Sequence, residues 1–172
     1  MRRLLFVVGA AAVLGYGCSA PTASSGPRDQ RSAASATALP VNRLRAEPYS
    51  FAYYSGMADS ARVTVRDAGA WRQAWSAVWR GSSPVPALPQ IDFGQEMVVV
   101  VALGTRNSGG YSILVDSAYQ YGDRVEVVVR KESPGSRCFT TAALTQPVDI
   151  ARIPASTLPV RFRERSFVHD CT

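Results

Sequence analysis

The sequence is poor in the residues that most enzymes use for catalysis. It has one histidine, His169, and one lysine, Lys131. Nucleophilic catalysis needs a base beside the nucleophile, and neither a Gly-x-Ser-x-Gly nor a Ser-x-x-Lys motif occurs. Carboxylates could serve as acid and base, but the predicted strands bring no pair together among Asp92, Glu96, Asp116 and Glu126. We therefore expect a chain that is not an enzyme and that uses no metal or small-molecule cofactor.

The apolar run that opens the chain is too short to span a bilayer. Leu4–Leu14 has the length of a signal-peptide core, and Arg2 and Arg3 precede it. Small residues then lead to Cys18, and the whole resembles a bacterial lipoprotein signal. It departs from that pattern at Gly15, where leucine is usual.

We therefore expect residues 1–17 to be a signal peptide and Cys18 to carry the lipid. The mature chain would be anchored in the cell envelope, on a periplasmic or outer-membrane face. The alternative is an ordinary secretory signal, cut near Ala20 or after Ala36. Both predict export.

Three cysteines is an odd number for an exported chain. Lipidation of Cys18 leaves Cys138 and Cys171, which can pair in an oxidising compartment. The chain-entropy estimate for a loop of this length is about 3.5–4 kcal/mol. A metal site with His169 is the alternative, but it would lack a fourth ligand.

Residues 18–46 are rich in alanine, serine, threonine and proline and have no apolar periodicity. We expect them to form the lipidated cysteine and a flexible tether. Residues 47–172 would then form one globular domain.

The positive charge does not indicate a nucleic-acid partner. Without Arg2 and Arg3 the formal net charge of +6 falls to +4. Arg161, Arg163 and Arg165 alternate along a predicted strand and would share one face, which is typical of a solvated surface. No stripe of basic and aromatic residues accompanies them.

The globular part predicts a β-rich α+β fold. One amphipathic helix is expected from Asp67, an N-cap residue, to Gly81, with its tryptophans on the core face. The unbroken apolar run at 96–104 is typical of a strand buried on both faces. Short turns predict mainly antiparallel pairing, and a sandwich is one arrangement compatible with it. The seven predicted strands are 49–57, 60–66, 96–104, 111–119, 123–131, 148–154 and 158–166.

The stretch "GTRNSGGY" has the glycine content of a phosphate-binding loop. Such a loop must lead into a helix, whose N-terminus holds the anion, whereas this one runs from strand to strand. We interpret it as a hairpin whose glycines are structural, with Arg106, Asn107 and Ser108 displayed at the tip. Its residues are Gly104, Thr105, Arg106, Asn107, Ser108, Gly109, Gly110 and Tyr111.

Several short motifs in order resemble the C-terminal domain of the protease complex subunit PrcB family. They are Asp92-Phe93 before the apolar strand, Gly104–Tyr111, Pro134-Gly135, and the strand Pro147–Pro154. The resemblance covers residues 50–163. It implies an exported, often lipid-anchored domain, first noted in a subunit that assembles with a surface protease, and it implies no catalysis. The pair Cys138 and Cys171 is not part of that pattern.

A weaker resemblance connects "NSGGY" with the binding loop of chagasin-type cysteine-protease inhibitors. Only the glycine and the tyrosine correspond. The leading hypothesis is therefore a lipid-anchored module that binds or assembles with a protein partner through Gly104–Tyr111. A protease inhibitor that uses the same loop, and a purely structural envelope lipoprotein, remain the alternatives.

Overall fold

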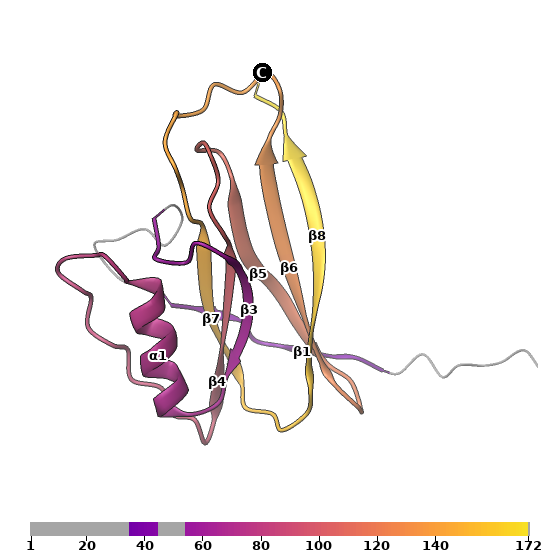
Figure 1. Cartoon of the computed structure of the whole chain (residues 1–172). Coiled ribbons are helices and arrows are strands. Elements are labelled where there is room, and N and C mark those ends of the chain that lie inside the picture. The colour runs from indigo at the N-terminus through magenta and orange to yellow at the C-terminus, as the bar shows by residue number, and fades with distance from the viewer. Residues whose placement is uncertain (1–34, 45–53, 172) are drawn as a thin grey trace, which may run out of the picture. The chain divides into compact units, whose positions relative to one another are not determined.

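The computed structural model describes residues 35–44 and 54–171, all of which belong to one unit, Ala34–Thr172 (Figure 1). The predicted signal peptide and Cys18 lie outside these residues. The described part of the chain contains one helix and eight strands: β1 (Thr37–Leu39), β2 (Asn42–Arg43), β3 (Ser60–Val65), α1 (Ala68–Val78), β4 (Glu96–Leu103), β5 (Ser112–Gln120), β6 (Val125–Pro134), β7 (Val148–Pro154) and β8 (Val160–His169).

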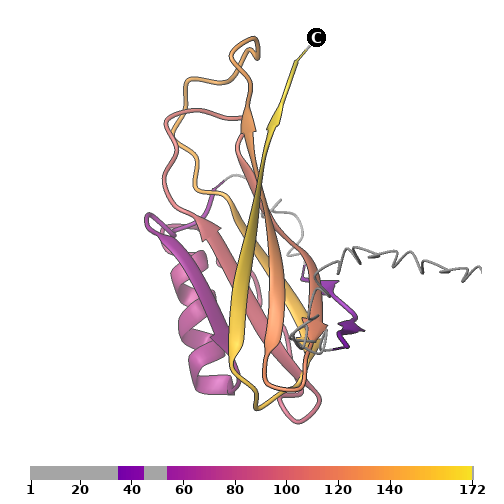
Figure 2. The ribbon, with the colours of Figure 1, turned by 90° about the vertical axis from the view of Figure 1, so that its right-hand side faces the viewer.

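The strands form two four-stranded sheets. One has the order β2-β7-β4-β3 and is covered on one face by α1; we call it the helix-covered sheet. The other has the order β1-β5-β6-β8; we call it the outer sheet. All pairs are antiparallel except β6 with β8, which are parallel. The two views of the ribbon show the helix, the helix-covered sheet and the outer sheet as successive layers (Figures 1 and 2). The predicted β-rich, mainly antiparallel α+β fold is confirmed.

Strand β4 forms the centre of the core, since both of its faces are buried. Val98, Val100 and Ala102 pack towards the helix, while the alternate residues pack towards the outer sheet. Because successive side chains of a strand point to opposite faces, the unbroken apolar sequence serves both layers. The prediction of a strand buried on both faces is confirmed.

Helix α1 begins where the sequence predicts. The Asp67 carboxylate accepts a hydrogen bond from the Ala70 N–H at 2.8 Å and caps the first turn. Its tryptophan face is core, as expected. The indole N–H groups of Trp71 and Trp75 donate to the carbonyls of Pro89 and Pro86 at 2.9 and 3.0 Å. Both carbonyls belong to the segment 82–90, which we call the proline-rich loop, and this loop therefore satisfies the polar ends of side chains that the helix buries.

The domain begins earlier than the predicted boundary at residue 47. β1 pairs with β5 of the outer sheet, and β2 pairs with β7 of the helix-covered sheet. Leu39 and Val41 pack between the sheets, whereas Leu44 packs on the helix side. The expected flexible tether is therefore wrong for this part of residues 18–46. Three apolar residues were too few to show a periodicity, although each has a place in the core.

Two other expectations need correction. Residues 54–57, the described part of the predicted strand 49–57, are not a strand. In β5 the alternation predicted from Ile113 and Val115 holds only as far as a bulge between Val115 and Ser117. After the bulge, Ala118 takes the buried position. A bulge inserts one residue and so exchanges the two faces of the strand.

Candidate functional site

The segment Gly104–Tyr111 is a crossing between the two sheets. It joins β4 to β5, but β4 pairs with β3 and β7, whereas β5 pairs with β1 and β6. The predicted hairpin is therefore wrong. Two consecutive strands joined by a short polar loop look the same in sequence whether they pair edge to edge or face each other across a core.

The glycines of this loop are structural, as expected. Gly104 and Gly110 have φ of 77° and 85°, a conformation that L side chains rarely adopt. At Gly109 the reason differs: a Cβ there would lie 2.5 Å from the Thr141 hydroxyl oxygen. Loop 104–111 thus reverses direction against a second loop that lies in close contact with it.

That second loop is the segment 135–147, between β6 and β7. The backbones of Arg106 and Thr145 exchange two hydrogen bonds, at 2.7 and 2.9 Å. The Gly109 N–H donates to the Thr141 carbonyl at 3.0 Å, and the Thr145 hydroxyl donates to the Ser108 carbonyl at 2.8 Å. Loop 104–111 is therefore held along one side by loop 135–147.

The three predicted tip residues are not displayed equally. Arg106 is half-buried, and its guanidinium donates to the Leu103 carbonyl at 2.8 Å and lies 5.8 Å from the Tyr111 ring centre. Ser108 is also half-buried, whereas Asn107 is exposed. The expectation that all three are offered to a partner is wrong for Arg106, because its guanidinium turns inward and holds the loop against its own strand.

Exposed apolar side chains surround these loops. Phe139 and Leu144, both in loop 135–147, are 105% and 68% exposed, and Phe167 and Val168 at the end of β8 are 42% and 68% exposed. We call this surface the loop end; it consists of loops 104–111 and 135–147 with residues 166–171. Sequence reasoning missed Phe139 and Leu144. The sequence does contain a signal for them, because both are large apolar residues in a segment with no strand or helix pattern.

A small cleft of about 160 Å³ opens beside the loop end. Arg106 and Tyr111 form one wall, and Lys131 and Ser166 come from the neighbouring strands. Among the described residues, Arg106 has no carboxylate within ion-pair distance. The cleft is also lined by Glu132, and Lys131 is paired with Glu164, so its lining carries charges of both signs beside the apolar side chains of Leu103 and Phe167.

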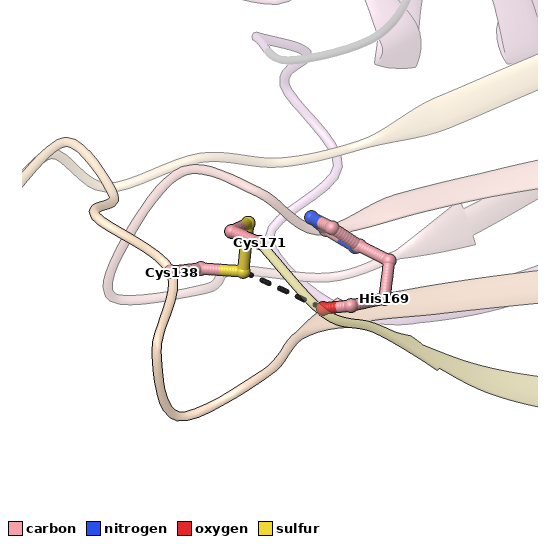
Figure 3. Close-up of side chains that lie close together, drawn as sticks. All are labelled: Cys138, His169 and Cys171. Atoms are coloured by element: carbon pink, nitrogen blue, oxygen red, sulfur yellow. Dashed lines mark hydrogen bonds between the residues drawn. A yellow bond between two sulfur atoms is a disulfide. The ribbon is translucent and has the colours of Figure 1, made fainter.

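The predicted disulfide joins Cys138 to Cys171, with an S–S distance of 2.06 Å (Figure 3). The dashed line in Figure 3 joins the Cys138 sulfur to the His169 carbonyl oxygen, 3.4 Å apart. Since a disulfide sulfur has no proton to donate, we regard this as a contact; the Gly135 N–H supplies the hydrogen bond to that carbonyl, at 2.8 Å. The Cys138–Cys171 disulfide is typical of a protein in an oxidising, extracytoplasmic compartment.

The same three residues were the metal-site alternative. Among the described residues, Cys138, His169 and Cys171 are the one group of three side chains close enough to share an ion, with ligand atoms within 4.8 Å of one another. The two sulfurs are bonded to each other, so neither is a thiolate that could bind a metal. The disulfide therefore replaces that alternative.

The four carboxylates considered for catalysis make separate local interactions. Glu96 pairs with Arg152 at 3.2 Å, and Glu126 pairs with Arg163 at 2.7 Å. Asp92 accepts the Gly94 N–H at 2.9 Å, and Asp116 accepts the Ser117 hydroxyl at 3.4 Å. Each of these four carboxylates interacts with a different neighbour, and none of the four is paired with another of them.

The outer sheet carries the predicted arginine face. Arg161, Arg163 and Arg165 of β8 are exposed. The neighbouring Glu164 points to the opposite face and contacts Lys131 and Arg62. The hydrogen bond from Lys131 lowers the pKa of Glu164 despite partial burial, and Arg62 adds to the effect. Glu164 is therefore a firmly ionised partner for two cations.

Within the described ranges, no helix is both long and apolar enough to cross a membrane. Comparisons with curated proteins and with solved structures gave no match. A family model described as PrcB C-terminal matches residues 97–154. This segment runs from β4 to β7 and contains both loops of the loop end, whereas β8 and Cys171 follow it. The match supports the predicted resemblance to the PrcB C-terminal family over residues 97–154.

Proposed function

We propose that the chain is a non-catalytic module that binds a protein partner, a protease complex of the cell envelope, through its loop end. The observation that carries the proposal is the exposure of Phe139 and Leu144 on a loop that is hydrogen-bonded to loop 104–111 at Thr141 and Thr145 and joined to the C-terminal segment by the disulfide. Exposed apolar groups rimmed by polar residues are typical of protein interaction sites. A rigid scaffold also lowers the entropy lost on binding.

The family match supports the kind of partner. The segment that matches the PrcB C-terminal family contains both loops, so Phe139 and Leu144 lie on the matched part of the chain, whereas residues 166–171 of the loop end follow it. Loop residues displayed by a rigid scaffold commonly carry binding. Asn107 is the member of the predicted tip that is free to contact a partner.

The inhibitor alternative is less well supported. A loop that enters a protease cleft must project beyond its neighbours, whereas loop 104–111 is hydrogen-bonded along one side to loop 135–147. Inhibition of a captured protease by the wild-type chain would distinguish the two roles. An assembly module is expected to leave the activity of the protease intact.

Capture of partners from cross-linked envelopes tests the proposed surface. We expect the double variant Phe139→Ser/Leu144→Ser to lose a protease-complex partner that the wild type retains. The matched control is Val85→Ser, which removes an apolar side chain that is 55% exposed on the proline-rich loop. Surface changes of this kind alter stability by about 0.5 kcal/mol or less, so melting curves should superimpose. A folded double variant that still captures every wild-type partner would place the binding surface elsewhere.

We further propose that lipid on Cys18 holds the module at the membrane. Cys18→Ala should release the protein from the membrane fraction or leave it unprocessed. Cys171→Ser, which removes a different cysteine, should remain membrane-bound. Wild-type protein that is soluble and begins beyond Cys18 would contradict the anchor and leave the proposed binding surface unaffected.

A further inference from the structure

Strand β8 lies at the border of the outer sheet. Over its whole length, Val160–His169, it pairs on one side with β6. On its other side no strand of the described part of the chain pairs with it. Figure 1 shows it as the last strand of the layer, running up to the C-terminal end. A border strand of 10 residues is long for an exposed edge.

The hydrogen bonds at the two ends of β8 show which backbone groups remain free. The Val125 N–H donates to the Pro159 carbonyl at 3.0 Å, and the Gly135 N–H donates to the His169 carbonyl at 2.8 Å. Alternate residues of a strand direct their backbone groups to the same side. The odd-numbered residues of β8 therefore face β6. The N–H and C=O groups that face the open border belong to the even-numbered residues, Val160, Phe162, Glu164, Ser166 and Val168.

The open border carries positive charge along its exposed face. Arg161, Arg163 and Arg165 repeat every second residue, about 6.5–7 Å apart along a strand. Arg163 pairs with Glu126 at 2.7 Å. In the described ranges, Arg161 and Arg165 have no carboxylate within ion-pair distance. Two cations, four residues apart on the same face of β8, are thus left beside a row of free backbone groups.

The disulfide keeps this border extended. A terminal strand is usually poorly ordered unless something holds it. Here Cys171 is joined to Cys138, and the Gly135 N–H holds the His169 carbonyl. The strand is therefore fixed at its last residues as well as along β6, so a binding segment would meet a border that is already formed.

We propose that the β8 border binds an extended acidic segment of the protein partner as an added strand. This rests on the proposed function, because it specifies how that partner is held. Strand addition uses the free N–H and C=O groups for affinity and the alternate side chains for specificity. Acidic residues at every second position of the segment would face Arg161 and Arg165.

A second copy of the chain fits this border less well. In an antiparallel pair of β8 strands centred on Glu164, Arg163 of each copy lies opposite Arg165 of the other. Like charges directly opposite each other destabilise a strand pair. The arginine row thus disfavours self-association and favours an acidic strand.

A peptide as long as β8, capped at both ends and alternating threonine with glutamate, is the direct probe for the full-length protein. We expect it to slow amide hydrogen exchange by about tenfold or more at Phe162, Glu164, Ser166 and Val168. The odd-numbered amides, already bonded to β6, should change little. A peptide alternating threonine with lysine is the control. The proposal is overturned if the acidic peptide does not bind, if protection does not alternate, or if the even-numbered amides are already protected without peptide.

Ser166→Pro tests the backbone contribution. Proline removes one N–H that faces the open border and leaves the β6 bonds intact, which edge strands tolerate. Ser166→Thr is the matched control, since it keeps the N–H. We expect the proline variant to fold and to lose peptide binding, while the threonine variant keeps it. Binding that survives in folded Ser166→Pro would overturn the proposal.

Arg161→Gln/Arg165→Gln tests the charge. Exposed ion pairs contribute little each, so the double variant should weaken peptide binding about fivefold, and added salt should act in the same direction. Unchanged affinity would overturn the acidic preference. If the wild type binds vesicles of anionic phospholipid and does not bind the peptide, the proposal is overturned and the arginine row is assigned to a membrane surface.

The two proposals can fail separately. If Ser166→Pro still captures the partner while Phe139→Ser/Leu144→Ser does not, the loop end binds the partner and the border does not. If no partner is captured by any form, the proposed function fails. In that case, amide hydrogen exchange measured with the acidic peptide still shows whether the β8 border can bind an added strand.

Discussion

Asp149 of β7 and Arg43 of β2 together hold the bulge of β5 across the interface between the two sheets. One carboxylate oxygen of Asp149 accepts the Val115 N–H at 2.7 Å and the Arg43 Nε–H at 3.2 Å. The Arg43 Nη2 group donates to the Val115 carbonyl at 2.6 Å. A bulge leaves backbone groups without ladder partners, and these two side chains supply partners from the opposite sheet. A residue of the predicted tether thus stabilises the core.

We expect Asp149→Ala to lower the free energy of unfolding by about 2–4 kcal/mol, because it leaves the buried Val115 N–H without an acceptor. Urea denaturation gives the value directly. Asp116→Ala is the control: it removes an exposed carboxylate from the same bulge and should change stability by about 0.5 kcal/mol or less. Equal effects of the two substitutions would show that the interaction across the sheets contributes nothing.

Gly110→Val is expected to destabilise the fold by about 1–3 kcal/mol. Gly110 has φ of 85°, and a Cβ there would lie 3.0 Å from the Pro134 side chain. Gly122→Ala offers the comparison, since a Cβ at Gly122 meets nothing within 4 Å and its φ is not positive. Thermal unfolding followed by circular dichroism separates the two. Similar melting temperatures for both variants would contradict the assigned role of Gly110.

Cys171→Ser should reduce the free energy of unfolding by about 3.5–4 kcal/mol, the chain-entropy estimate for a bridge with this separation. The sequence separation of the two cysteines is 33 residues. Reductant provides an internal control. It should lower the melting temperature of the wild type to that of the variant and leave the variant unchanged. Two free thiols in protein from an oxidising compartment would contradict the bridge.

Stability should fall in acid partly through Glu164. Its pKa is lowered in the folded chain, chiefly by the hydrogen bond from Lys131. The stabilisation is therefore complete above the pKa of an unfolded glutamate, about 4.3, and is lost as pH falls through the lower folded value. Glu164→Gln should flatten the dependence of the urea midpoint on pH below about 4.3. Lys131→Met, which removes the first partner, should act in the same direction. An unchanged acid slope in both variants would exclude this contribution.

The sequence by itself determined the elements with a strong local signal. The helix follows from the Asp67 cap and the spacing of its tryptophans, and the doubly buried β4 follows from its unbroken apolar run. The disulfide followed from export and cysteine number, since only Cys138 and Cys171 remained to pair. These inferences needed no knowledge of which strands are neighbours.

The tertiary structure decided everything that depends on sheet membership. Loop 104–111 crosses between sheets, β8 runs parallel to β6, and residues 37–43 join both sheets. Pairing is settled by the whole set of faces that must be buried together, and no short stretch contains that information. For the same reason, Arg106 turned inward and Phe139 was left exposed, although both lie in polar loops. Local pattern specifies which residues form a strand or a helix; the arrangement of the layers specifies which of their side chains a partner can reach.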